Sequence, residues 1–178
     1  MKISVITVCF NSANTIARAL QSVAAQTWPD VEHIVVDGVS TDGTMQVVAK
    51  HRASLAHVLC EPDKGIYDAM NKGLNLATGD LVAFLNADDF YKDAAVLSRV
   101  ARVVQDGPLD DLYGDGVFLR SVGTVLVVRP YDSGRFPPGW RWRGWIAGRR
   151  PMGRGGPRRP VRCLLLNSSE RSWPDRSP

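Results

Sequence analysis

Two adjacent carboxylates, Asp88 and Asp89, directly follow the apolar run Leu81–Leu85. Such a run has the pattern of a buried strand, so both acids would stand at the mouth of a sheet. Mg²⁺ and Mn²⁺ are commonly held by one or two carboxylates together with substrate phosphates. The alternative is that the pair starts a turn and caps the helix expected from about Asp93. These two residues alone leave both interpretations open.

Two further expected strands end in polar residues. Asn11 closes the first, Lys2–Cys9, and Asp37 closes the second, Val31–Asp37. Asp37 could reach the ribose or base edge of a nucleotide, whereas the polar residues after it could simply cap the next helix. Three polar strand ends in one chain favour a shared crevice over unrelated turns.

A fourth polar group lies in the segment Glu61–Gly73. Asp68 and Asn71 are one helical turn apart, so both could face the crevice and hydrogen-bond a nucleobase. Lys72 lies on the same polar face, and we expect it to belong to an ordinary solvated helix surface.

The intervening segments alternate between strand and helix periodicity. A third, weaker strand is expected at Leu55–Cys60 and a fourth at Leu81–Leu85. Apolar residues recur at helical spacing between the strands, with Asn11 or Ser12 as N-cap of the first helix and Thr41 or Asp42 as cap of the second. This alternation predicts an α/β fold with a mostly parallel sheet and helices on both faces. Ligands of such sheets bind beyond the carboxyl ends of the strands.

The pattern changes after residue 128. Residues 111–119 and 122–128 are expected to form a β-hairpin, and no period-2 or period-3.6 pattern follows. Residues 1–128 hold 10 of the 22 Lys and Arg and 15 of the 18 Asp and Glu, a net charge of −5, whereas residues 129–178 have a net charge of +9. We therefore expect a folded domain over 1–128 and an irregular tail over 129–178 that is rich in Arg, Pro, Gly and Trp.

The sequence also argues against several classes of protein. The apolar stretch from Ile3 to Phe10 is too short to span a membrane and lacks a cleavage site, so no export signal is visible. Three widely spaced cysteines, Cys9, Cys60 and Cys163, argue against a disulfide framework or a zinc site and for reduced thiols in a cytoplasmic protein. The basic charge belongs to the tail and does not indicate a nucleic-acid-binding domain.

Four motifs, in this order and spacing, resemble the family 2 glycosyltransferases, which are inverting enzymes of the GT-A (Rossmann-like) fold. The motifs are SVITVCFNSANTI, VEHIVVDGVSTDGT, EPDKGIYDAMNKGLNLATGD and FLNADD. The resemblance as a whole covers about residues 2–128 and is strongest to the bacterial branch that acts in cell-envelope and exopolysaccharide assembly. Asn86 stands where many members have the first acidic residue of the metal-binding DxD motif.

The resemblance implies roles for the residues above. Asp88 and Asp89 would hold Mg²⁺ or Mn²⁺ against the diphosphate of a nucleotide-sugar donor. Asn11, Asp37, Asp68, Asn71 and Asp88 would bind the nucleotide sugar. The acceptor would be a lipid-linked molecule or a saccharide, which fits a cytoplasmic protein at the inner face of the membrane, and no nucleic-acid partner is expected.

The resemblance leaves the catalytic base without a candidate. Relatives carry it after a His-Pro pair and an acidic run, and residues 129–178 have neither; Asp115 resembles a position near the acceptor. We expect the family pattern to break at Trp140–Ile146, through truncation or a shifted reading frame, and the fold to be incomplete there. Translating the other two frames tests this, since neither should restore the missing segment if the tail is native.

Three alternative functions remain at this stage. The chain could be an inactive nucleotide-sugar-binding remnant, if the missing base has cost it activity. A genuine tail could bind anionic lipid or nucleic acid through Arg and Trp. A nucleotidyltransferase would need a Gly-rich phosphate loop after the first strand, where this chain has Phe10–Asn14 without glycine.

Overall fold

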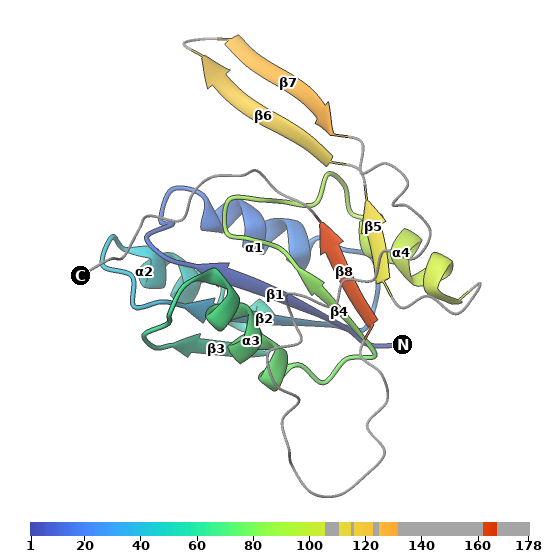
Figure 1. Cartoon of the computed structure of the whole chain (residues 1–178), viewed down its shortest axis with the longest axis horizontal. Helices are drawn as coiled ribbons and strands as arrows, with labels where there is room; N and C mark the ends of the chain where they lie inside the picture. The colour runs from blue at the N-terminus through green and yellow to red at the C-terminus, as the bar shows by residue number, and fades with distance from the viewer. Residues whose placement is uncertain (106–110, 115, 123–124, 132–161, 167–178) are drawn as a thin grey trace, which may run out of the picture.

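The computed structural model describes residues 1–105, 111–114, 116–122, 125–131 and 162–166, with side chains described up to residue 105. The first half alternates strand and helix as the sequence predicts (Figure 1). The strands are β1 (Ile3–Cys9), β2 (Val31–Asp37), β3 (His57–Cys60), β4 (Leu81–Phe84), β5 (Asp111–Gly114), β6 (Gly116–Val122), β7 (Val125–Tyr131) and β8 (Arg162–Leu166). The helices are α1 (Ile16–Ala24), α2 (Thr44–Lys50), the 3₁₀ turn η1 (Arg52–Ser54), α3 (Ile66–Leu76) and α4 (Val96–Gln105).

A six-stranded sheet in the order β3-β2-β1-β4-β8-β5 forms the centre of the molecule. Every pairing in it is parallel, with Cys9 of β1 opposite Asp37 of β2, and Asp37 opposite Cys60 of β3. Parallel strands connected through helices produce the predicted α/β class, and the polar strand ends consequently leave the sheet on one edge.

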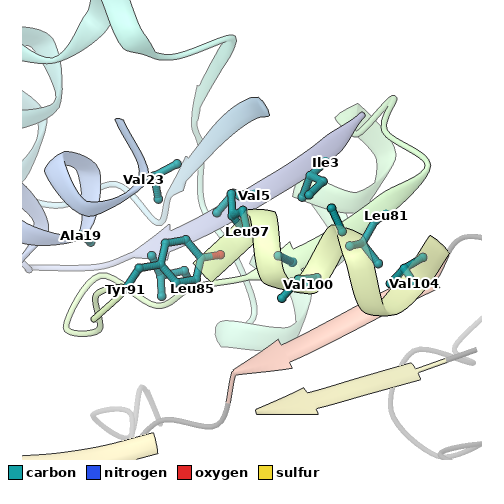
Figure 2. Close-up of a cluster of buried hydrophobic side chains, with 12 residues drawn as sticks. Ile3, Val5, Ala19, Val23, Leu81, Leu85, Tyr91, Leu97, Val100 and Val104 are labelled. Carbon is teal, nitrogen blue, oxygen red and sulfur yellow. The ribbon is translucent and has the colours of Figure 1, made fainter. Parts of the chain in front are cut away.

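Helices cover both faces of this sheet because successive side chains of β1 point to opposite faces. Ile6 and Val8 pack with α3, whereas Ile3 and Val5 pack with α1 and α4 (Figure 2). The β-branched runs of β1 and β2 are therefore buried on both sides, as expected for central parallel strands.

The close fit of α3 depends on Gly73. A Cβ atom at this position would lie 2.4 Å from Cγ2 of Ile6 and 3.3 Å from Cγ2 of Val36. The absent side chain lets the helix approach β1 and β2, so the position of α3 over the sheet is set by this glycine.

The structure differs from the expectations at the chain's second half. The segment predicted as one hairpin strand, 111–119, is divided: β5 joins the main sheet, and β6 pairs antiparallel with β7 outside it. β8, within the tail expected to be irregular, lies between β4 and β5. The predicted break at 140–146 lies outside the described residues.

The predicted N-cap of the first helix is also wrong. α1 begins at Ile16 after Thr15, without a side-chain cap. The amide oxygen of Asn11 accepts the N–H of Thr41 instead, and the hydroxyl of Ser12 donates to the carbonyl of Phe10. The side chain of Asn11 is thus used by the loop after β2, and that of Ser12 by its own loop.

A buried carboxylate joins three segments at the amino edge of the sheet. Glu32 accepts hydrogen bonds from Lys2 Nζ (2.9 Å), from the N–H and hydroxyl of Thr78 (both 2.8 Å), and from the hydroxyl of Ser4. The same Ser4 oxygen accepts the N–H of Gly79 at 2.8 Å. The connection from α3 to β4 is therefore fastened to β1 and β2.

These bonds make Glu32 a source of pH-dependent stability. Burial alone would raise its pKa, but the hydrogen bonds from Ser4, Thr78 and Lys2 outweigh burial and lower the pKa from 4.5 to about 2. Because the pKa is lowered on folding, the stabilisation is present above the unfolded value and is lost as the pH falls toward 2.

We expect Glu32→Gln to flatten the acid limb of the stability curve. The wild-type free energy of unfolding should fall by roughly 3 kcal/mol more than that of the variant between neutral pH and pH 2. Urea titrations across this range measure the difference. Asp30→Asn, at an exposed carboxylate, is the control and should follow the wild type; parallel curves for Glu32→Gln and wild type would contradict the assignment.

Candidate active site at the carboxyl edge

The ends of β1, β2 and β4 lie side by side. The N–H of Gly38, just after β2, donates to the carbonyl of Cys9 at 3.0 Å, and the N–H of Ala87, after β4, donates to the carbonyl of Val8 at 3.2 Å. The chain therefore continues in contact beyond each strand, and the residues that follow emerge at one edge. Four of the predicted site residues are found there: Asn11, Asp37, Asp88 and Asp89.

The loop after β1 is fixed to the loop after β2 by side-chain oxygens. The N–H groups of residues 11, 12 and 13 donate in turn to Ser40 Oγ (2.8 Å), Thr44 Oγ1 (2.8 Å) and Asp42 Oδ2 (3.0 Å). Asp42 also accepts the N–H of Thr44, the first residue of α2, but the N-cap of this helix is Gly43 without a side-chain cap, so the cap predicted at Thr41 or Asp42 is wrong. Its hydrogen bonds to Thr44 and Ala13 lower the pKa of Asp42.

This arrangement bears on the nucleotidyltransferase alternative. A phosphate-binding loop presents a row of free backbone N–H groups to the anion. Here the three consecutive amides after β1 are already used by the second loop. The geometry therefore disfavours phosphate binding at this loop, in agreement with the absence of glycine from it.

Asp37 lies at the centre of the edge, with its side chain fully buried. Ser40 donates both its N–H (2.8 Å) and its hydroxyl to the carboxylate. Two thiols also donate to it, Cys9 at 3.4 Å to Oδ1 and Cys60 at 3.2 Å to Oδ2. Burial, with the nearby carboxylate, raises the pKa values of both thiols, so both remain protonated donors at neutral pH.

Sequence reasoning missed the two thiols as neighbours of Asp37. It interpreted Cys9 and Cys60 as incidental reduced thiols. The signal that could have found them is positional: each cysteine is the last residue of its strand, and the parallel register places both opposite Asp37.

The acidic pair lies on a tight turn after β4. The N–H of Asp89 donates to the carbonyl of Asn86 at 3.0 Å, which closes a four-residue turn. Asp88 is exposed, and Asp89 and Asn86 are half-buried. The turn thus presents one carboxylate to solvent and a second carboxylate beside it.

Two aromatic residues after the turn attach it to α1. The guanidinium of Arg18 stacks on the ring of Phe90, 3.5 Å from its centroid. Tyr91 is buried in the core cluster with Leu85 and Leu97, and its N–H donates to Ser22 Oγ at 3.1 Å (Figure 2). The position of the acidic turn is therefore set by contacts to the helix that follows β1.

The donor set of this turn fits a hard divalent cation. Two carboxylates on adjacent residues, one of them exposed, match the partial protein coordination that Mg²⁺ or Mn²⁺ completes with phosphate oxygens and water. Among residues 1–105, where side chains are described, no cluster of three or more His, Cys, Asp or Glu forms a complete metal cage. A metal here would accordingly depend on a ligand for its remaining coordination.

Asp68 and Asn71 are less directly connected to this edge. They belong to α3, which covers the opposite face of the sheet from the one carrying Cys9. The Asp68 carboxylate accepts the N–H of Lys64 at 3.0 Å and lies 3.7 Å from Lys72 Nζ, while Asn71 is exposed. Lys72 also pairs with Glu61 at 2.9 Å, so it ties the helix to the preceding loop.

One residue beside Asp37 has an unfavourable backbone conformation. Val39 has φ 65°, in the left-handed region that β-branched residues rarely adopt, and its side chain is 44% exposed. The hydrogen bonds of the following Ser40 to Asp37 hold the loop in this shape. Val39 therefore represents backbone strain stored next to the site.

We expect Val39→Gly to stabilise the protein by about 1 kcal/mol, because glycine adopts this φ without the steric cost. Chemical denaturation of the variant and the wild type measures the change. Val39→Ala is the matched control: it shortens the exposed side chain but keeps a Cβ, so it should recover less than half of the gain. Equal gains from both would assign the effect to the exposed side chain.

None of the helices in the described part of the chain has the length and apolar character to cross a membrane. Asp115, which resembles a position near the acceptor, lies outside the described residues.

Comparison with known proteins agrees with this geometry. A glycosyltransferase of PGL/p-HBAD biosynthesis from Mycobacterium bovis (strain BCG / Pasteur 1173P2) is 41% identical over 122 residues, 66% of this chain and 47% of that protein. The chain thus spans about half the length of the curated relatives it matches.

Solved structures show the same fold. Staphylococcus aureus TarS 1–349 in complex with UDP-GlcNAc has a TM-score of 0.59 at 34% identity, over 64% of this chain and 34% of that chain. A mannosyltransferase from Pyrobaculum calidifontis in complex with GDP-Man and Mn²⁺ has a TM-score of 0.54 at 30% identity, over 57% and 31%. The model of the family described as "Glycosyl transferase family 2" matches residues 4–159, well past the last motif, FLNADD, which ends at Asp89. With a GT-A sheet and the family's motifs at its carboxyl edge, the chain belongs to glycosyl transferase family 2.

Proposed function

We propose that this chain binds a nucleoside-diphosphate sugar at the carboxyl edge and transfers the sugar, with inversion, to an acceptor hydroxyl. The observation that carries the proposal is the placement of Asp37 and the Asn86–Asp89 turn after neighbouring parallel strands. One carboxylate thereby lies where a base or ribose would bind, and two lie where a metal on the diphosphate would be held. The complexes of the relatives with UDP-GlcNAc and with GDP-Man and Mn²⁺ support this division.

Each part of the edge has a separate task in the proposal. Asn11 and Asp37 line the nucleoside side, with Asp68 and Asn71 in the first two turns of α3 as further nucleotide contacts. Asp88 and Asp89 hold Mg²⁺ or Mn²⁺. The bound ion supplies charge stabilisation as the nucleoside diphosphate departs. Arg18 and Phe90 act indirectly, by fixing the turn that carries the two acids.

The acceptor side is the less defined half of the proposal. A hydroxyl that attacks the anomeric carbon must lose its proton to a positioned base. We assign no residue to this role. A lipid-linked or saccharide acceptor, met on the cytoplasmic face of the membrane, is the class we propose.

The test is calorimetric titration of the full chain with UDP in the presence and absence of Mn²⁺. We expect UDP to bind only with the ion. Asp88→Asn and Asp89→Asn should each weaken UDP binding by about tenfold or more, because each removes a charge from the proposed metal position.

Asp93→Asn is the matched control. This acid lies four residues after Asp89 but pairs with Arg99 at 3.0 Å, so UDP affinity should be unchanged. Binding of UDP that is equally tight in chelator, or equally affected by all three variants, would refute the proposed metal site.

A further inference from the structure

The carboxylate of Asp37 has no free acceptor position in this structure. Oδ1 accepts the hydroxyl of Ser40 and the thiol of Cys9; Oδ2 accepts the N–H of Ser40 and the thiol of Cys60. An ionised carboxylate offers about four lone-pair sites, and these four donors surround it, although Cys9 shares its one thiol proton with the carbonyl of Val36. With the side chain fully buried, a nucleotide can reach Asp37 only if one donor leaves.

Three of the four donors are held by their surroundings. Ser40 supplies two of them, and its hydroxyl oxygen also accepts the N–H of Asn11 at 2.8 Å, so its movement would open the loop after β1. Cys9 is 1% exposed and lies in the core cluster with Ile16 and Leu20. Displacing either residue would disturb the packing that positions the site.

Cys60 is less constrained than these three donors. It is exposed and it ends the edge strand β3, and among the described residues the only other polar contact of its sulfur is with the backbone N–H of Val39 in the adjoining loop. A thiol is also the weakest type of donor among the four. The Cys60 thiol therefore provides a hydrogen bond to the buried carboxylate and is the most easily replaced of the four donors.

We propose that the Cys60 thiol is an exchangeable hydrogen-bond donor to Asp37. It is displaced when an N–H or O–H of the donor nucleotide forms a hydrogen bond with Oδ2 instead. The inference rests on the proposed function, since it takes Asp37 as a nucleotide contact. Cys60 is then a positioning residue whose hydrogen bond competes with the ligand. The hydrogen bond from residue 60 must be weak enough for the nucleotide to replace it. A stronger donor at this position would keep the carboxylate occupied and lower the affinity for the nucleotide.

The experiment compares Cys60→Ser and Cys60→Ala in the full chain by calorimetry with UDP and Mn²⁺. Serine donates a stronger hydrogen bond to a charged acceptor than cysteine does, so we expect UDP affinity to fall by about three- to tenfold. Alanine removes the competing donor, so affinity should equal or exceed that of the wild type.

Thermal unfolding without nucleotide supplies the second readout. Cys60→Ser should unfold at the same temperature as the wild type or higher, because it keeps Asp37 hydrogen-bonded, although it binds UDP more weakly. A residue with only a structural role would lower stability and affinity together. A loss of UDP affinity without a loss of thermal stability is therefore specific to competition for Asp37.

Two results would overturn the inference: affinities of both variants within twofold of the wild type, or an alanine variant that binds UDP as weakly as the serine variant or more weakly. Failure of the proposed function looks different. In that case the wild type does not bind UDP with Mn²⁺, or Asp88→Asn and Asp89→Asn leave binding intact.

Discussion

Parallel pairing of β1 with β2 and with β4 is the constraint on which the site depends. It brings three loops, far apart in sequence, out of the sheet at one edge. The loops after β1 and β2 are then fixed to each other by Ser40, Asp42 and Thr44, which accept the backbone N–H groups that a flexible loop would expose to water. Short polar side chains thus determine the shape of the edge, and apolar strands determine its location.

The elements of the first hundred residues could be predicted because each carries its own periodicity. The buried runs of β1 and β2 and the spacing of Ile66, Ala69 and Gly73 are local signals, and the elements appear where those signals are. β8 has no such signal: five residues, Arg162–Leu166, find a place between β4 and β5 only through pairing with distant strands. The division of residues 111–122 between β5 and β6 has the same origin.

The sequence predicts which residues lie at the site, but it does not predict which side chains are their hydrogen-bond partners. A polar residue after a buried strand identifies Asn11, Asp37 and Asp88 as edge residues from sequence. Which donors surround a carboxylate depends on register across three strands, so the thiols beside Asp37 could not be assigned from spacing along the chain. The cap expected at Asn11 failed for a related reason, because its side chain serves the neighbouring loop.

The two edges of the sheet are held by different means. At the amino edge, buried Glu32 fastens β1, β2 and the chain entering β4 through charged and backbone hydrogen bonds. At the carboxyl edge, the Cys60 thiol and the Asp88 carboxylate are exposed, so these side chains can move without disturbing the buried clusters. A ligand would therefore be met by mobile side chains on a fixed backbone, and the amides held by Ser40, Asp42 and Thr44 should exchange slowly with solvent, like those of the amino edge.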